Sequence, residues 1–363
     1  MRTAVRTSVA ALCFLAGLRH AAVAGPQGDQ TPTYDRDAAT RASPEQPTAA
    51  PTPSPWLDLS PSNVLAAGPD PAARPDRRLA SALTLGGIYA GFVTWTYFAW
   101  YRTENHEFLW ADPNKDGSWK VWSDEGWFGP TRYAGGADKL GHAWATLALG
   151  RAGTELLHQW GGYSKLSSAL VGNGLSWALF LGVEIKDGYA YTFSIGDFVF
   201  NTLGAGFGIA QSLVPAVDDL IDFRVAYLPS PVYREHFKND GDVDVAEDYS
   251  GQTYLLAFHL GAIKPLREAR WGTWSQFVDV AVGFESRGYK PEPPEGMMGE
   301  PRTRSSFVGI SLNAQGLFDY LLRGRSEPLR KITHGAFEVF NLPYTHVQVL
   351  DRTVHATEVV PEF

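Results

Sequence analysis

The chain contains four long apolar stretches that are rich in glycine, alanine and serine. They cover residues 79–101, 138–158, 166–183 and 198–217, and only the second is interrupted by charges in its interior. Uninterrupted apolar runs of this length are typical of helices that are buried or cross a bilayer. Small residues four apart let such helices pack closely, as in membrane bundles. We therefore predict a mainly α fold, a four-helix, Gly/Ala-rich, membrane-associated bundle, with a tightly packed soluble four-helix core as the alternative.

The pattern changes in the last third of the chain. In 278–284, Val278, Val280, Val282 and Phe284 alternate with small or polar residues, and 307–312 repeats the alternation. A period of two predicts strands with one buried face. Two or three strands are too few for a barrel. The prediction is a smaller C-terminal α/β or β-hairpin region packed on the bundle.

The N-terminal part differs from both the apolar helical stretches and the C-terminal strands. Arg2 and Arg6 precede an apolar core and a small-residue site at 22–24, the pattern of an export signal. The proline-rich stretch that follows cannot bury enough apolar surface to fold. We divide the chain into a signal peptide (1–24), a disordered linker (25–78), a helical bundle (79–228) and a mixed region with short strands (229–363). This organisation predicts an exported protein of the cell envelope, in the periplasm or at the outer membrane.

Composition narrows the expected partners. Charged residues make up 19% of the chain and aromatic residues 13%, a balance that suits contact with lipid. A net charge of −8 argues against nucleic acid, which normally selects a basic surface. No phosphate-binding Gly-x-x-x-x-Gly-Lys-Ser/Thr motif occurs, so a nucleotide is not expected either. Membrane lipid is the expected partner, with a second envelope protein as a further candidate.

Three polar clusters border the apolar stretches and carry the candidate chemistry. At helical spacing, the members of each cluster lie on one face of a helix. Ionisable groups beside uncharged helices are costly unless they are paired or functional. The candidate site residues are Asp138, Lys139, His142, Glu184, Asp187, Asp197 and Asn201.

Local chemistry suggests a role for several of these residues. Asp138 stands where a helix begins and is expected to cap backbone amides. His142, one turn later, is expected to hydrogen-bond to Asp138 or to bind a metal. Lys139 is expected to neutralise Glu184 or Asp187. The alternative is a purely structural network of helix caps and ion pairs, and the sequence identifies no cofactor or particular metal.

The order of these motifs resembles a known family. Asp-Lys-x-x-His, then Glu-x-x-Asp, then Asp-x-x-x-Asn-x-x-Gly is similar to the YfiM-like predicted periplasmic lipoproteins, a family of unknown function, over roughly 138–214. VanZ-like membrane proteins show a comparable progression. The chain departs from lipidated members, because bulky Leu12 precedes Cys13 where a small residue is needed. The resemblance implies an envelope location and a site, but not a reaction.

Two functional hypotheses follow. In the first, the clusters form a hydrolase-like or metal-assisted site that acts on lipid or cell-wall material at the membrane surface. Asp138 and His142 would serve as base or metal ligand, and Glu184 and Asp187 as ligands or acid. Asp197 with Asn201 would orient them. In the second, the protein is a non-enzymatic envelope scaffold or binding protein whose polar cluster is a structural ion-pair network.

Overall fold

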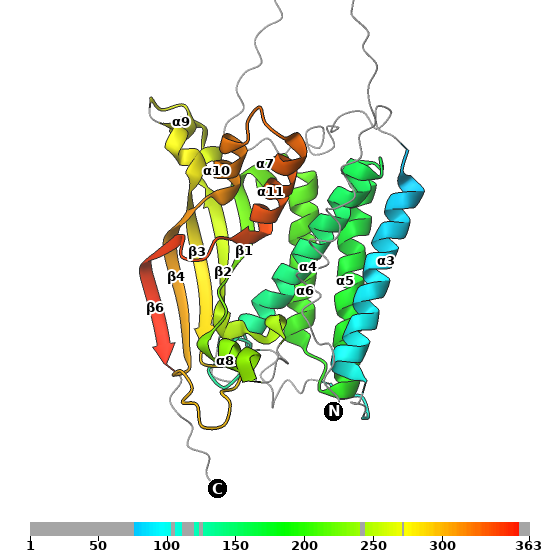
Figure 1. Cartoon of the computed structure of the whole chain (residues 1–363), viewed down its shortest axis with the longest axis vertical. Coiled ribbons are helices and arrows are strands. Elements are labelled where there is room, and N and C mark those ends of the chain that lie inside the picture. Colours follow the sequence, from blue (N-terminus) through cyan, green and yellow to red (C-terminus); the bar gives the residue numbers. More distant parts are fainter. Residues whose placement is uncertain are drawn as a thin grey trace, which may run out of the picture. The chain divides into compact units, whose positions relative to one another are not determined.

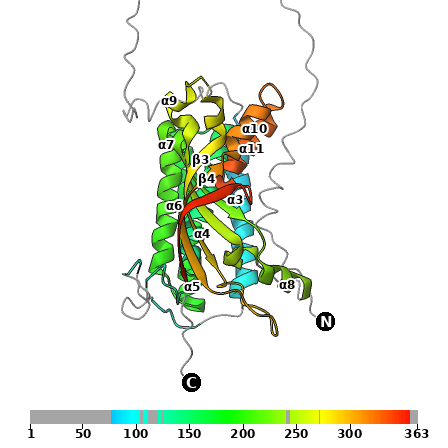
Figure 2. The same cartoon turned by 90° about the vertical axis from the view of Figure 1, so that its left-hand side faces the viewer.

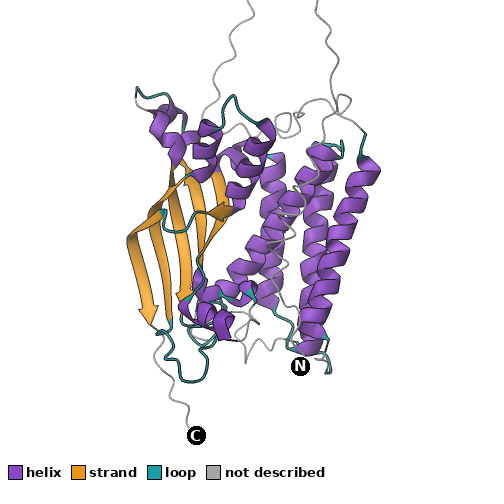
Figure 3. Ribbon diagram, viewed as in Figure 1, coloured by secondary structure: helices purple, strands orange, loops and turns teal. Residues whose placement is uncertain are grey.

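The computed structural model describes residues 76–102, 106–110, 120–122, 126–239, 244–270 and 272–355. These residues belong to one compact unit, in which long helices stand beside a sheet (Figures 1 and 3). The predicted export signal (1–24) and residues 25–75 of the predicted linker lie outside the described residues.

Each of the four apolar stretches forms a helix, as predicted. They are α3 (Arg78–Thr96), α4 (Ala137–Glu155), α5 (Lys165–Ala190) and α6 (Ile195–Leu213), with π-helical turns at Tyr97–Tyr101 and Leu156–Trp160 extending α3 and α4. Helices α4, α5 and α6 pack on one another, and α3 lies alongside α5 (Figure 1). By length and composition, α3 and α5 are apolar enough to cross a membrane. Membrane association of the helices stays a prediction.

Small residues set the distance between the central helices. A Cβ at Gly204 of α6 would lie 2.2 Å from the Ala143 carbonyl oxygen of α4, which is far inside van der Waals contact. Gly150 and Gly208 are similarly close to Asn173 of α5. The backbones therefore approach more closely than any residue with a side chain would allow.

The C-terminal region is a six-stranded sheet, larger than the predicted hairpin. Its order is β5-β1-β2-β3-β4-β6, antiparallel except for β1 with β5. Residues 342–345 alone connect β5 at one edge to β6 at the other, and Ser311 of β4 donates a hydrogen bond to Asn341 of β5 (3.0 Å). The sheet therefore curls around one of its faces. The strands are β1 (Ile221–Tyr227), β2 (Gln252–His259), β3 (Val278–Arg287), β4 (Thr303–Leu312), β5 (Phe340–Asn341) and β6 (His346–His355).

Both predicted strands exist, but the prediction that their apolar face is buried was wrong for the middle of the sheet. Val280 and Val282 are 37% and 48% exposed, whereas Asp279, Ala281 and Gly283 are buried. The physical reason is the curl. The concave face encloses the small side chains of β3, packed with Leu255 and Phe307, together with a buried ion-pair cluster, so Val280 and Val282 point outwards.

The outer face of β1 and β2 packs on the bundle. Val225 and Tyr254 form one apolar core with Ala134 and Ala137, at the start of α4. The Trp144 indole of α4 also donates to the Val339 carbonyl at the end of α11 (2.7 Å). Shorter helices surround the sheet (Figure 2): α7 (Pro215–Leu220), α8 (Pro231–Asn239), α9 (Lys264–Arg267), α10 (Ala314–Leu321) and α11 (Glu327–Val339).

Candidate functional site

The helix directions bring the three motifs to one end of the bundle. The first turns of α4 and α6 carry two motifs, and the last turns of α5 carry the third. Because the link 191–194 between α5 and α6 is short, the end of α5 lies beside the start of α6. Gly136 enters α4 with φ +97°, and a Cβ there would overlap the Phe128 ring. Only glycine is compatible with this entry.

His142, Glu184 and Asn201 form the centre of the cluster. Nδ1 of His142 lies 3.2 Å from Glu184 Oε1 and 3.3 Å from Asn201 Oδ1. The Asn201 amide donates to the same Glu184 oxygen (3.2 Å), and Thr146 donates to Asn201 Oδ1 (2.9 Å). Glu184 and Asn201 are buried at 1% exposure each, while the His142 side chain keeps 20%. The histidine is thus the member of this group that solvent can reach.

Lys139 connects the two remaining aspartates. Its Nζ lies 2.7 Å from Asp138 Oδ2 and 2.9 Å from Asp197 Oδ1. Ser194 caps α6 by accepting the Asp197 amide (3.2 Å), which fixes the backbone at Asp197. Asp197 therefore stands in the first turn of α6, as expected.

Three expected contacts within the cluster were wrong. Asp138 does not cap α4: its first turn follows Gly136, which makes no side-chain cap, and Asp138 pairs with Lys139 instead. His142 contacts Glu184 and not Asp138. The ion pairs of Lys139 are with Asp138 and Asp197, not with Glu184 or Asp187, although the charge of Lys139 still acts to lower the pKa of Glu184. Helical spacing gives the face of one helix, but partners on other helices decide these contacts.

Asp187 lies at the edge of the cluster and binds a residue that the sequence did not single out. The Tyr101 hydroxyl, at the end of the π-helical turn after α3, donates to Asp187 Oδ1 (2.6 Å). Burial raises the pKa of Asp187 to about 6, against the opposing effect of the Tyr101 hydrogen bond. Thr146 was missed as well. Tyr101 and Thr146 carry no charge at neutral pH, so a search for clusters of charged side chains could not find them.

Burial and charge act differently on the central groups. Burial raises the pKa of Glu184 well above its usual value, and the charges of Asp197 and Asp187 add to the effect. Burial would also raise the pKa of Asp197, but Lys139 and His142 hold it below its usual value. For Lys139, burial is outweighed by Asp138 and Asp197, which raise its pKa. The cluster therefore keeps a charged lysine beside a strongly perturbed glutamate, a combination common at functional sites.

Three of these side chains could hold a metal ion. One ligand atom each from His142, Glu184 and Asp197 lies within 4.8 Å of the others. Ligand atoms around a four-coordinate ion with bonds near 2.1 Å are about 3.4 Å apart, so the cluster would need to contract slightly. Nitrogen and carboxylate oxygen are suitable ligands for zinc and similar divalent metals.

Two other buried charge clusters lie outside the predicted residues. Arg151 of α4 pairs with Asp218 (2.8 Å) and Glu338 (2.5 Å), joining α4 to α7 and α11. Inside the curled sheet, Arg224 pairs with two aspartates and with none of the residues of the helical site. The members of both clusters are scattered along the chain. Asp222 and Arg224, two apart in β1, share a face by strand spacing, but no spacing rule could have grouped the other members.

The comparisons with known proteins concern the helical site. No curated protein and no solved structure matches this chain. A family model does match residues 124–212, a segment that contains all seven predicted site residues. The description of this family, given below, agrees with the predicted location in the cell envelope. The similarity to VanZ-like proteins stays a prediction. The segment that builds the polar cluster thus matches the family described as "Predicted periplasmic lipoprotein (DUF2279)", which confirms the resemblance that the three motifs predict.

Proposed function

We propose that the cluster at the end of α4, α5 and α6 binds a divalent metal and supports hydrolysis of lipid or cell-wall material at the membrane surface. The observation that carries this proposal is the convergence of His142, Glu184 and Asp197 within 4.8 Å of one another. Three protein ligands that leave one position open are the usual arrangement of a catalytic zinc site.

The charge balance of the cluster supports a bound cation. Asp138, Asp197 and Glu184 bring three carboxyl groups together, and among the described residues Lys139 is the one permanent positive charge that contacts any of them. Burial raises the pKa of Glu184, and a divalent ion would stabilise the ionised form that this burial disfavours.

The surrounding residues would orient the ligands. Asn201 contacts both Glu184 and His142, and Thr146 holds Asn201 through its amide oxygen. Lys139 holds Asp197 through its Oδ1 atom, at 2.9 Å. Such outer contacts are a regular feature of metal sites and tune ligand basicity. A bound metal would supply an activated water or polarise the scissile group.

Exposed apolar side chains support a position at a membrane. Leu79, Leu83 and Val93 of α3 and Phe98 of the π-helical turn after it are each more than half exposed, and α5 adds further exposed leucines. Large exposed apolar surfaces usually mark a contact with lipid or protein. Since the cluster lies at one end of these helices, an envelope lipid or a cell-wall fragment could reach it from the surface.

Metal content of the purified protein tests this proposal. We expect about one equivalent of a divalent metal in the wild type. His142→Ala should lose it, and the matched control His355→Ala, changed at the exposed end of β6, should keep it. If a metal is found, hydrolysis of phospholipid vesicles and of cell-wall fragments is assayed next. A wild type that binds no added zinc or manganese contradicts the proposal.

One observation favours a second function, that of a non-enzymatic scaffold or binding protein. Lys139 already bridges Asp138 and Asp197, and Glu184 already has His142 and Asn201 as partners. A network with this many internal contacts can simply hold three helices together. In that case His142→Ala lowers the melting temperature, and no metal is bound by either protein.

A further inference from the structure

One end of the molecule carries a basic surface, although the protein as a whole is acidic. Helix α9 and the 3₁₀ helix Gly272–Phe277, which precedes β3, lie beside the α10–α11 hairpin at this end (Figures 1 and 2). Segments 260–277 and 320–331 together contain seven basic residues and two acidic ones, whereas the whole chain has a net charge of −8. We call these two segments the basic tip.

Most of the positive charge of the basic tip is not neutralised within the molecule. Each of its two acidic residues pairs with a lysine four residues away, at 3.9 and 3.0 Å. Asp319, just outside the tip, pairs with His334 (2.7 Å). Five arginines of the tip, of which only Arg330 is half-buried and the others are exposed, form no ion pair with any described residue: Arg267, Arg270, Arg323, Arg325 and Arg330. These charges are available to a partner.

Contacts between the two segments make the basic tip one surface. The Tyr320 ring packs edge-on against Phe277, with centroids 5.4 Å apart, and the Arg323 guanidinium donates to the Gln276 side-chain oxygen (3.1 Å). Arg323 also lies over the Tyr320 ring, 5.2 Å from its centroid. Gly324 then turns the chain with φ +70°, and nothing lies within 4 Å of its Cβ position. The turn between α10 and α11 is therefore held from below and open to solvent above.

Large apolar side chains stand among these arginines. Trp274, Tyr320, Leu321 and Leu329 are all exposed. Tryptophan and tyrosine are enriched at the boundary between membrane and water, and apolar residues beside basic ones are typical of segments that lie in that boundary. The guanidinium group of arginine is well suited to binding phosphate. The basic tip thus combines groups for the phosphates of lipid headgroups with groups for the acyl chains beneath them.

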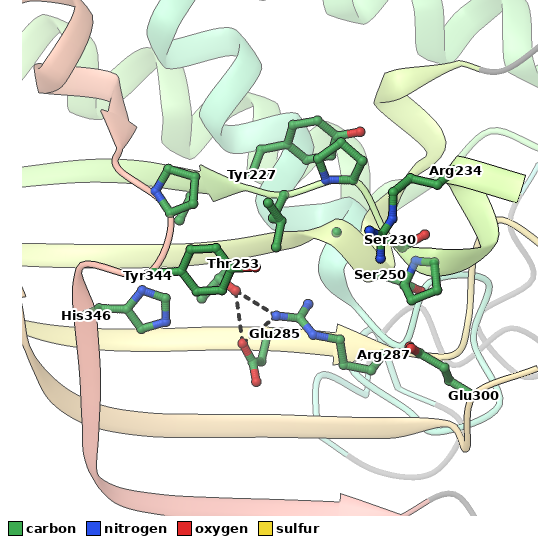
Figure 4. A pocket seen from close by; sticks show the side chains of 16 residues that line it. Tyr227, Ser230, Arg234, Ser250, Thr253, Glu285, Arg287, Glu300, Tyr344 and His346 are labelled. Carbon is green, nitrogen blue, oxygen red and sulfur yellow. Dashed lines mark hydrogen bonds and ion pairs between the residues drawn. The ribbon is translucent and has the colours of Figure 1, made fainter. Parts of the chain in front are cut away.

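The opposite end of the sheet offers a contrast. There the end of β3 and the start of α8 border a cavity of about 390 Å³ (Figure 4). Arg287, in the cavity wall, pairs with Glu285 (2.6 Å), and Lys238 of α8 pairs with Glu235 (3.1 Å). Positive charges at this end therefore have acidic partners within the protein, whereas most of those of the basic tip have none among the described residues.

We propose that the basic tip docks on a membrane surface that contains anionic phospholipids. The arginines without an acidic partner bind lipid phosphates, and Trp274, Leu321 and Leu329 enter the boundary of the acyl chains. The charge of the tip favours this occupant over a second copy of the chain, because two tips of the same sign repel each other.

This inference does not rest on the metal proposal, but it narrows the substrate class. Arg151, near the end of α4, pairs with Glu338 of α11, so the hairpin stands at the end of α4 that is far from the polar cluster (Figure 1). Helix α4 has 19 residues and is about 28 Å long. A membrane at the basic tip leaves the polar cluster facing away from that bilayer, which favours cell-wall material over the lipid of that membrane.

Vesicle flotation tests the proposal. The full-length protein is diluted from detergent into preformed phosphatidylcholine vesicles, with or without phosphatidylglycerol. Binding should need phosphatidylglycerol and decrease with salt. Arg323→Gln combined with Arg325→Gln should weaken binding roughly thirtyfold, because each arginine near an anionic surface contributes about fivefold. The matched control combines Arg234→Gln with Lys238→Gln in α8, which removes the same charge at the opposite end and should leave binding unchanged.

A fluorescent label identifies the surface that meets the lipid. In a Cys13→Ser background, which lacks cysteine, the label is attached at Leu329→Cys or, as the control, at Phe237→Cys, an exposed aromatic position of α8. Spin-labelled lipids should quench the label at position 329 and not the label at position 237.

Several results would overturn the inference. They are no binding to phosphatidylglycerol vesicles, equal binding to neutral vesicles, wild-type binding by the double arginine variant, and a label at position 329 that bound vesicles do not quench. A lipid-free dimer that the double arginine variant abolishes would also overturn it, since the basic tip would then bind protein. Metal content is measured separately, so these failures are distinguishable from a failure of the metal proposal.

Discussion

Two buried polar clusters of this protein are built from similar residues but differ in how their charges are paired and in how far solvent can reach them. In the curled sheet, Arg224 and His259 face Asp222 and Asp279 at 2.5 to 3.1 Å, and three of the four residues are completely buried. Burial would lower the pKa of His259, but hydrogen bonds to both aspartates raise it to about 9. Two cations therefore meet two anions, and the cluster is neutral and closed.

The cluster between the helices is not closed. The His142 side chain keeps 20% of its surface exposed, and burial raises the pKa of Glu184, so the contacts present do not stabilise this carboxyl group as an anion. A closed neutral cluster has nothing left to bind, whereas an open cluster with such a carboxyl group can accept a cation. The difference between the two, and not the presence of a buried histidine, is what favours a site in the helices.

The largest expected effect is on the sheet cluster. Arg224→Met leaves Asp222 and Asp279 buried with only His259 between them. Removing one partner from a buried ion pair costs about 3–5 kcal/mol. Urea unfolding should show a loss of this size in the free energy of unfolding. A loss below about 1 kcal/mol, the usual value of an exposed pair, would mean that the cluster is solvated and the contrast with the helices is false.

The same cluster should make stability depend on pH. The folded pKa of His259 is raised to about 9, above the unfolded value near 6.5. Its contribution is therefore fully present below pH 6.5 and is lost as pH rises through 9. We expect the free energy of unfolding to fall by roughly 3 kcal/mol across this window. Burial also raises the pKa of Glu338, to about 8, so the decrease due to His259 is the part that disappears in His259→Gln.

Helix packing beneath the helical cluster should show an intermediate effect. In Gly204→Ala the new methyl group meets the Ala143 carbonyl at 2.2 Å, so α4 and α6 must separate. Overpacking of this kind costs about 1–3 kcal/mol. Gly206→Ala on the same helix is the matched control, since nothing lies within 4 Å of its Cβ. Alanine favours the helix by up to about 1 kcal/mol there, so thermal unfolding should shift in opposite directions in the two variants.

The two regions also differ in how far the sequence predicts them. Long uncharged runs and helical spacing are local signals, and they locate α3 to α6 and the seven site residues. The sheet is defined by contacts between distant strands. In β1, Asp222 and Arg224 interrupt the apolar pattern because they face a closed interior, so the strand resembles a polar segment. The curl of the sheet decides which face of β3 is buried, and no pattern within β3 contains that information.

The smallest expected effect on stability is at the helical cluster itself, in Glu184→Gln. The amide has the shape of the carboxyl group and can still contact Asn201 and His142, so the free energy of unfolding should change by less than about 1.5 kcal/mol. Metal content should nevertheless fall, because an amide is a poor ligand for zinc. Thermal unfolding and metal analysis of the same sample check both parts. If Glu184→Gln instead destabilises the protein as strongly as Arg224→Met does, the helical cluster is a structural network like the one in the sheet. That result would favour the scaffold function over the metal-assisted hydrolase.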